Sequence, residues 1–129
     1  MLQRAHFEAW ILAYERAWRT PGTAALHSLF TDGAWYSPAP FEVTLIGRIA
    51  IAKFWDRERI SPDEKFSFRA DLVSVEGDTA VARVHVNYED ERGASYKDLW
   101  IIVLDDDGRC RHFEEWPFFE GQLRAAPPD

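Results

Sequence analysis

The sequence predicts an α+β domain in which helices come first and an antiparallel sheet follows. Through the first part of the chain, apolar residues recur at three- and four-residue steps, which is typical of amphipathic helices. From Lys65 onward the period changes to two, and Gly-containing acidic turns divide the remainder into strands at about 65–75, 79–89, 95–104 and 109–118. The 129 residues are enough for one domain.

Three helices are expected before the sheet. The first has an apolar face made of Phe7, Trp10, Ile11, Tyr14, Ala17 and Trp18. Thr20-Pro21 is typical of the N-cap and first position of a second helix, which is expected to end near Leu29-Phe30. The turn 31–33 then leads into a short strand at 34–37 and a proline-containing loop. A third helix is expected from Gly47 to about Ile60, with Ser61-Pro62 ending it.

The strand at 98–104 is apolar on both faces. Trp100, Ile102 and Leu104 point one way, whereas Leu99, Ile101 and Val103 point the other. The helices can cover only one of these faces, so a second copy of the chain is expected to cover the other, as a homodimer through the back of the sheet. The alternative is that the loops and the tail shield it.

Composition excludes several classes of partner. The formal net charge is −7, which argues against nucleic acid and against anionic membranes. The first twenty residues contain charges throughout, so no signal peptide or membrane span is expected, and the predicted location is cytoplasmic. Six Trp, four Tyr and nine Phe are many for a small domain and indicate either dense packing or an aromatic cavity.

No cofactor or metal is expected. The single Cys110 excludes a cysteine cluster, and a packing role is favoured for it. The four histidines lack the short spacing of metal ligands, and their positions place His6 and His27 on helix surfaces and His85 and His112 on the back of the sheet. There is no glycine-rich phosphate-binding motif.

Four segments of the chain carry a family resemblance. They are Tyr14…Ala17-Trp18, Leu29-Phe30-Thr31-Asp32-Gly33-Ala34, Ser37-Pro38…Gly47-Arg48-Ile49-Ala50-Ile51 and Asp105-Asp106-Asp107-Gly108…Phe113-Glu114-Glu115-Trp116. With these segments the chain resembles the nuclear transport factor 2-like superfamily, and its SnoaL-like branch in particular, from about residue 5 to 120.

The resemblance implies a cone-shaped α+β barrel with a curved antiparallel sheet wrapped around three N-terminal helices and an apolar pocket between them. The SnoaL-like domain would occupy 1–122, followed by a flexible tail at 123–129. Dimers through the back of the sheet are common in the superfamily. The fold hosts isomerases, dehydratases, cyclases and binding proteins, so it does not fix the chemistry.

Ketosteroid isomerase, the best understood enzyme of this fold, pairs an aspartate base with an oxyanion hole made of a tyrosine and a protonated aspartate. By motif spacing, the oxyanion tyrosine falls on Tyr14, the base falls on Ser37 and the protonated aspartate falls on Trp100. Two of the three groups are therefore absent, and steroid isomerisation by that mechanism is not expected. The resemblance still suggests Tyr14 as a hydrogen-bond donor to a developing oxyanion.

Two carboxyls are the candidate acid–base pair. If Asp105 and Gly108 close the last hairpin, Trp100 lies opposite Phe113 and Asp98 lies opposite Glu115, and the family register places all four on the pocket face. Carboxylates at that separation cannot both ionise readily, so one is expected to keep its proton. A one-residue bulge would instead place Glu114 opposite Asp98. In a further alternative both groups are solvated and screened by Arg111 or Lys97.

The wide end of the cone is expected to bind a small hydrophobic ligand. Its predicted lining residues are Trp18, Trp35, Phe41, Trp100 and Phe113. The expected activity is that of a cofactor-independent isomerase, dehydratase or cyclase on a polyketide- or steroid-like compound, with Asp98, Glu115 and Tyr14 as catalytic residues. A non-catalytic ligand-binding or dimerisation module is the alternative.

Overall fold

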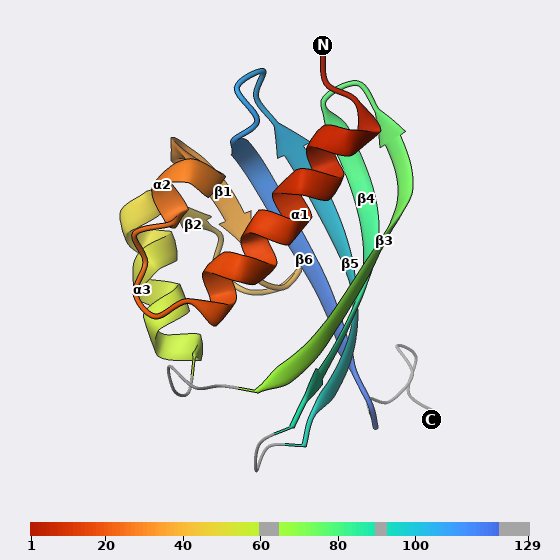
Figure 1. Cartoon of the computed structure of the whole chain (residues 1–129). Coiled ribbons are helices and arrows are strands. Elements are labelled where there is room, and N and C mark those ends of the chain that lie inside the picture. The colour runs from red at the N-terminus through yellow and green to blue at the C-terminus, as the bar shows by residue number, and fades with distance from the viewer. Residues whose placement is uncertain (60–64, 90–92, 122–129) are drawn as a thin grey trace.

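The computed structural model describes residues 1–59, 65–89 and 93–121. Helix α1 (Arg4–Arg19) lies across the concave side of a curved sheet, and α2 (Leu26–Leu29) and α3 (Arg48–Glu58) lie to one side of it (Figure 1). The strands are β1 (Phe30–Ser37), β2 (Leu45–Ile46), β3 (Phe66–Glu76), β4 (Thr79–Tyr88), β5 (Ser95–Leu104) and β6 (Cys110–Phe119). The predicted order of helices followed by a meander is confirmed.

The six strands form one sheet in the order β2-β1-β6-β5-β4-β3. The meander from β3 to β6 is antiparallel, as predicted. Strand β1, however, pairs in parallel with β6, so the sheet is mixed rather than wholly antiparallel. Parallel neighbours need a long connection, here α3 and the meander itself, and no local turn signal reveals such a pairing.

Helix α1 is fixed at both ends by its own sequence. At the start, the backbone N–H of Gln3 donates to Nδ1 of His6 at 2.8 Å, as part of a capping box. At the end, Thr20 is the C-cap and Pro21 follows it. The prediction that Thr20-Pro21 begins a second helix is therefore wrong, because a proline disfavours the helical conformation of the residue before it and here ends α1.

Strand β1 begins earlier than predicted. The residues expected to form a turn, 31–33, lie inside the strand, where the pairing with β6 shifts between Phe30 and Trp35. Helix α2 is reduced to four residues as a result, and β2 was not predicted. Part of the predicted turn at 91–93, the helix end at Ser61-Pro62 and the tail at 123–129 lie outside the described residues.

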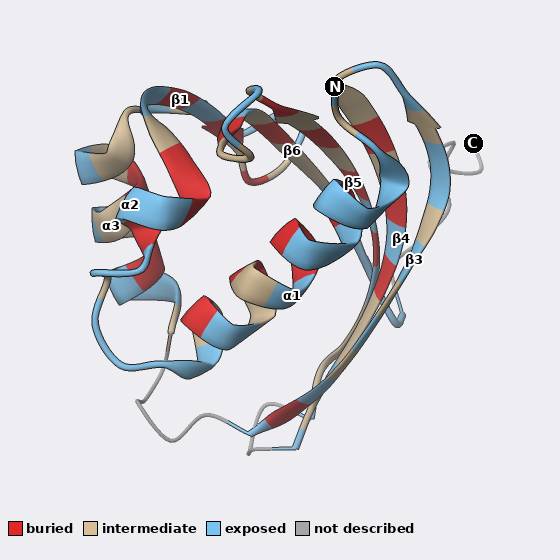
Figure 2. Ribbon diagram, turned by 45° about the horizontal axis from the view of Figure 1, so that its top comes forward, coloured by how far each residue is buried: buried red, intermediate tan, exposed pale blue. Residues whose placement is uncertain are grey.

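The core lies between α1 and the concave face of the sheet. Figure 2 shows the buried residues of α1 on the side of the helix that faces the strands. Phe113 of β6 is 0% exposed, and its ring lies 5.5 Å from that of Tyr14 and 5.1 Å from that of Trp100. These rings join helix and sheet by close aromatic packing.

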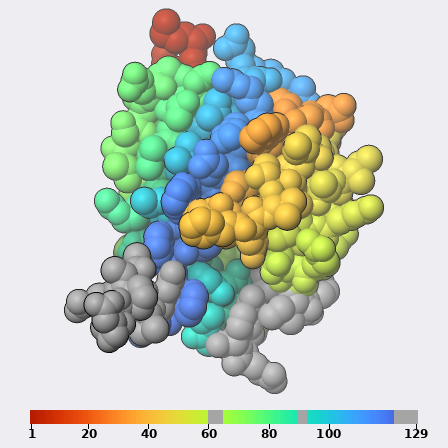
Figure 3. Space-filling view, turned by 180° about the vertical axis from the view of Figure 1, so that it is seen from behind, coloured from red at the N-terminus to blue at the C-terminus, as the bar shows by residue number. Residues whose placement is uncertain are grey.

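The outer face of the sheet carries the other half of the apolar strand β5. Leu99 is 41% exposed, and its cross-strand neighbour Trp116 of β6 is similarly exposed. The view from behind shows β6 in blue running across the middle of the molecule (Figure 3). Among residues 1–59, 65–89 and 93–121, no helix packs on this face, so the two-faced apolar character of β5 inferred from the sequence is confirmed.

Replacing Phe113 by alanine tests the aromatic core. The Phe113→Ala variant should lose about 3–5 kcal/mol of unfolding free energy, because the cavity left under α1 cannot collapse completely. The matched control is Phe41→Ala, since Phe41 is fully exposed, and its effect should stay within about 0.5 kcal/mol. Urea denaturation followed by tryptophan fluorescence measures both. Equal effects would contradict the proposed location of the core.

Candidate functional site

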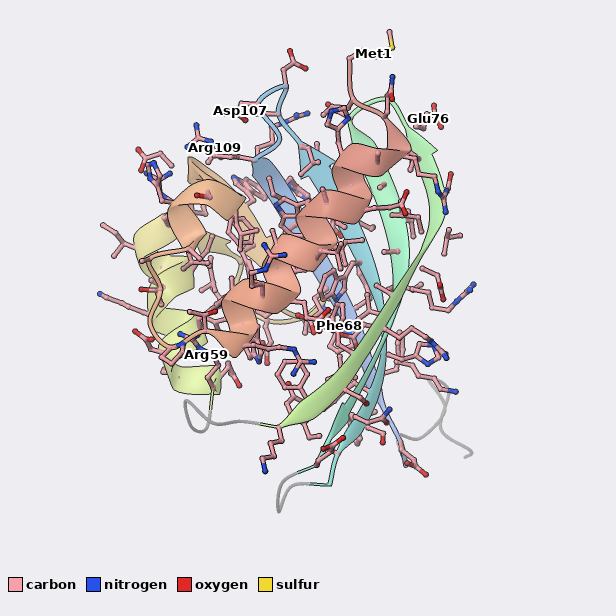
Figure 4. The ribbon with its side chains drawn as sticks, viewed as in Figure 1. Met1, Arg59, Phe68, Glu76, Asp107 and Arg109 are labelled. Atoms are coloured by element: carbon pink, nitrogen blue, oxygen red, sulfur yellow. The ribbon has the colours of Figure 1, made fainter. Side chains whose placement is uncertain are left out.

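A cavity of about 290 Å³ opens between α1, α3, the segment after β1 and the inner face of the sheet. Phe68 lines this cavity, and Figure 4 shows it in the same half of the molecule as Arg59. Glu76 and Asp107 lie at the opposite end of the molecule. The lining residues are Tyr14, Glu15, Trp18, Tyr36, Pro38, Ala39, Glu42, Phe54, Glu58, Phe66, Phe68, Val86, Tyr88, Tyr96, Asp98, Trp100, Glu115 and Pro117. The cavity is therefore mainly aromatic, with a few polar groups, as is typical of small-molecule sites.

The pairing of β5 with β6 differs from the predicted one by two residues. Asp98 lies opposite Pro117, and Glu115 lies opposite Trp100. Two local features cause the shift. In the turn, the N–H of Gly108 donates to the carbonyl of Asp105, and the N–H of Asp105 donates to the carbonyl of Arg109, so Asp105 is paired with Arg109. A β-bulge then adds one residue to β6 between Cys110, which pairs with Leu104, and His112, which pairs with Val103. The expected direct opposition of Asp98 and Glu115 is therefore wrong.

The two carboxyls nevertheless meet inside the cavity. A shift of two residues leaves every side chain on its original face, so Glu115 still points inward, diagonally across from Asp98. The long Glu side chain spans the diagonal, and the two carboxyls share a side-chain hydrogen bond. Glu114, the alternative partner, lies opposite Ile101 and bonds His112 at 2.7 Å instead.

Burial and mutual repulsion hold a proton on this pair. Asp98 is only 4% exposed, and desolvation raises its pKa, although the hydrogen bond from Glu115 opposes this. The pKa of Glu115 is raised well above its usual range, first by desolvation and then by the charge of Asp98. Of the two carboxyls, Glu115 therefore holds a proton more strongly than Asp98.

Neither Arg111 nor Lys97 screens the pair. Arg111 bonds Asp78 at 2.6 Å and Asp105 at 3.3 Å, at the turn end of the sheet, and Lys97 lies on the exposed outer face. The alternative of a solvated, screened pair is therefore wrong for Asp98.

Two tyrosine hydroxyls line the same cavity. The hydroxyls of Tyr14, on α1, and Tyr36, on β1, lie 3.0 Å apart in a hydrogen bond. Desolvation raises the pKa of both, and the charge of Glu115 raises them further, so both stay protonated. One of the two O–H groups donates to the other tyrosine, which leaves the second O–H available to a ligand.

Two buried indole N–H groups, of Trp100 and Trp55, influence the carboxyl of Asp98 and the hydroxyl of Tyr36 without forming a hydrogen bond to either. The N–H of Trp100 lowers the pKa of Asp98, and that of Trp55 lowers the pKa of Tyr36. Neither indole nitrogen, nor Oδ1 of Asp98, has a partner at hydrogen-bond geometry. An unsatisfied buried acceptor is costly, so Oδ1 of Asp98 is ready to accept a hydrogen from a ligand.

The aromatic lining was predicted only in part. Trp18 and Trp100 line the cavity, and Phe113 is buried in the core beneath it. Trp35 does not line it. The side chain is 50% exposed and stacks on His112 at the back of the sheet, because its neighbours in the alternating strand face inward. Phe41 is fully exposed in the segment after β1, where the expected inward position is also wrong.

Several cavity residues were not singled out from the sequence. Tyr36 could have been found, since it shares a strand face with buried Ala34. Glu42 and Glu58 lie in the segment after β1 and in the last turn of α3, where side-chain direction depends on tertiary packing. The remaining missed lining residues are Glu15, Pro38, Ala39, Phe54, Phe66, Phe68, Val86, Tyr88, Tyr96 and Pro117.

Other candidate groups lie away from the cavity. Burial raises the pKa of the Cys110 thiol to about 12, so this thiol is not a nucleophile near neutral pH. In the described part of the chain, no three His, Cys, Asp or Glu side chains are grouped as metal ligands would be. No described helix is long and apolar enough to cross a membrane.

The chain belongs to the SnoaL-like family, because the model of the SnoaL-like domain matches residues 11–113. The fold has the nuclear transport factor 2-like form, with three helices and a curved, unclosed sheet. A search of functionally curated proteins finds no match.

Solved structures of similar fold include enzymes of several kinds. The epoxide hydrolase/cyclase-like enzyme SalBIII, of pyran ring formation in the polyether salinomycin, aligns with a TM-score of 0.74 at 12% identity, covering 92% of this chain and 95% of that one. A candidate ketosteroid isomerase from Kribbella flavida gives 0.69 at 13%, covering 97% and 84%. A candidate polyketide cyclase from Sinorhizobium meliloti gives 0.62 at 22%, covering 83% and 93%. These likenesses establish the fold.

The raised pKa values predict how Glu115→Gln changes stability with pH. Between the ordinary pKa of a glutamate and the raised pKa of the pair, the folded protein binds more protons than the unfolded chain, so its unfolding free energy falls as pH rises. The Glu115→Gln variant does not lose unfolding free energy in this way, because an amide does not titrate, and the Gln side chain can still donate a hydrogen bond to Asp98. Below about pH 4 the two proteins should be equally stable, and at neutral pH the variant should be more stable by on the order of 1 kcal/mol.

Urea denaturation across this pH range measures the difference. The exposed Glu76, at the other end of the sheet, supplies the control Glu76→Gln, whose difference from the wild type should not depend on pH. A Glu115→Gln variant that is less stable than wild type at neutral pH would show that the buried Glu115 carboxyl does not lower the unfolding free energy at that pH.

Proposed function

We propose that the protein is a cofactor-independent acid–base catalyst of proton transfer, acting as an isomerase, dehydratase or cyclase on a small, largely hydrophobic ligand. One observation carries the proposal: two neighbouring carboxyls, whose pKa values are both raised by burial, lie on the wall of an aromatic cavity. This arrangement supplies a base and an acid side by side at the same pH.

Each group has a defined role in the proposed reaction. The carboxylate of Asp98 takes a proton from a C–H or O–H of the ligand through its free Oδ1. Glu115 gives its proton to the ligand atom that gains negative charge, such as a leaving hydroxyl or an opening epoxide oxygen. The proton taken by Asp98 then passes to Glu115 across their hydrogen bond, which restores the starting state.

The tyrosine pair would stabilise negative charge on the ligand. Either hydroxyl can donate in the Tyr14–Tyr36 hydrogen bond. In the proposed reaction one tyrosine donates to the other, and the second O–H donates to the ligand. Such a donor, fixed before the reaction and removed from water, lowers the energy of a developing oxyanion. The similar folds named for epoxide opening, isomerisation and cyclisation support a reaction of this type.

Turnover of three probes tests the proposal. A β,γ-unsaturated cyclic ketone reports isomerisation, a hydroxy-epoxide reports ring closure and a β-hydroxy ketone reports dehydration, each carrying a fused-ring body. Wild type should convert at least one of them. Asp98→Asn and Glu115→Gln should each reduce kcat by about 10²–10⁴-fold, and Tyr14→Phe by about 10–100-fold. Glu76→Gln should leave kcat unchanged.

Wild-type rates in the Asp98 and Glu115 variants would contradict the proposal. If no probe is converted but fused-ring compounds bind in the cavity, the second candidate, a non-catalytic ligand-binding module, is favoured. That candidate has its own support in the unsatisfied acceptor of Asp98 within an aromatic cavity.

We also propose that two copies associate through the outer face of the sheet. Leu99, Trp116 and Phe118 leave apolar surface exposed on adjacent strands, which water disfavours. The same face carries Arg83 on β4, Lys97 on β5 and Glu114 on β6. A two-fold axis would bring these opposite charges together. The cytoplasmic location expected from the sequence remains a prediction.

Sedimentation velocity tests the association. Wild type should sediment as a particle of twice the 15.0 kDa chain mass, whereas Leu99→Asp should sediment as a monomer, because it buries a charge near its own copy across the axis. The control is Leu12→Asp, since Leu12 is exposed on α1, away from the sheet, and this variant should stay dimeric. A monomeric wild type at micromolar concentration would refute the dimer.

A further inference from the structure

Every charged residue that lines the cavity is acidic. They are Glu15, Glu42, Glu58, Asp98 and Glu115. Among residues 1–59, 65–89 and 93–121, no Lys, Arg or His belongs to the lining. A site built for a carboxylate or phosphate would show the opposite pattern.

Three of the described arginines lie around the cavity, but none of them pairs with Glu42 or Glu58. Arg57 lies 5.9 Å from the centre of the Phe54 ring. Arg19 pairs with Glu15 at 2.9 Å and lies 4.0 Å over the ring of Phe66. Arg59 donates to the carbonyls of Thr20 and Gly22 at 2.8 and 2.9 Å. Glu15 is therefore neutralised by its own partner.

Glu42 and Glu58 are two cavity carboxylates without a cationic partner among residues 1–59, 65–89 and 93–121. Neither forms an ion pair with another residue in the described part of the chain. Both are exposed, so they lie where the cavity meets solvent. Their charges reach the interior, since both raise the pKa of Glu115.

The interior supplies the other parts of a binding site for a cation. Asp98 belongs to the cavity wall and is 4% exposed, and its buried Oδ1 has no hydrogen-bond partner. The rings of Trp18, Phe54, Phe68 and Trp100 line the same space. Aromatic faces attract cations, most strongly when water is excluded, and they also pack against flat apolar groups.

We propose that the ligand of this cavity is a protonated amine carrying a flat apolar body, held with its ammonium group toward Glu42 and Glu58 and its apolar body among the rings. This inference deepens the proposed function and rests on it for the ligand pocket. Binding in this orientation directs the reacting end of the ligand toward Asp98 and Glu115. Anionic compounds of the same shape are repelled.

Isothermal titration calorimetry with three matched probes tests the charge preference. The probes share a naphthyl body and differ in the end group: 2-(2-naphthyl)ethylamine is cationic, 2-(2-naphthyl)ethanol is neutral and 3-(2-naphthyl)propionate is anionic. The amine should bind about 10-fold more tightly than the alcohol, and the propionate most weakly. Higher ionic strength should weaken binding of the amine and leave binding of the alcohol unchanged.

Charge-removing variants locate the preference. The double variant Glu42→Gln/Glu58→Gln should weaken binding of the amine about 5- to 10-fold and leave the alcohol unaffected, because both side chains are exposed and their loss does not disturb folding. Glu76→Gln makes a charge change at the far end of the molecule and should alter neither affinity.

Three results would overturn the inference: equal or tighter binding of the alcohol or propionate, binding of none of the probes at millimolar concentration, and an amine preference that survives the double variant. The turnover assay with Asp98→Asn is independent of these results. If the wild-type protein shows no preference for the amine but its turnover still depends on Asp98, only the inference about the amine is overturned. An amine preference in a protein whose turnover ignores Asp98 would overturn only the proposed catalysis.

Discussion

The structure depends on the burial of one aromatic helix face against a curved sheet. Tyr14 stands at the centre of this contact, with its ring 4.6 Å from Trp100, 5.1 Å from Trp55 and 5.5 Å from Phe113. These rings come from α1, β5, α3 and β6, so the packing that stabilises the domain also fixes where the Tyr14 hydroxyl points. Because large rings on a strongly curved sheet cannot fill the space where α1 ends, the same packing leaves the cavity beside them.

The alternation of side chains along strands explains why the acid–base pair was predicted despite a wrong register. The turn and the bulge each displaced the pairing of β6 by one residue in the same direction. Had only one of them been present, Glu114 would face inward and Glu115 would face solvent. The face of a residue is encoded in local periodicity, whereas its exact partner depends on turn geometry, in this case a glycine with a φ of 84° at position 108.

Features outside regular elements could not be predicted in this way. Phe41 and Glu42 are adjacent in the segment after β1, yet the apolar ring is exposed and the carboxylate lines the cavity. No periodicity orders such a segment, and the preference of rings for the interior gave the wrong answer there. Likewise, β1 pairs in parallel with β6 across more than seventy residues of chain, and neither strand contains a local signal of that contact. The fold class and the inward face of the meander were predictable, but the mouth of the site was not.

The acidic residues at the mouth and the buried Asp98 act on the same proton, that of Glu115, and this connects recognition to chemistry. Besides desolvation, the charges of Asp98, Glu58 and Glu42 all raise the pKa of Glu115, which makes it a weaker acid. A positive charge bound between Glu42 and Glu58 would cancel part of this field and lower the pKa of Glu115. An acid releases its proton most effectively when its pKa lies near the working pH. In the proposed site, therefore, the ammonium group that selects the ligand also makes Glu115 a stronger proton donor once that ligand is bound.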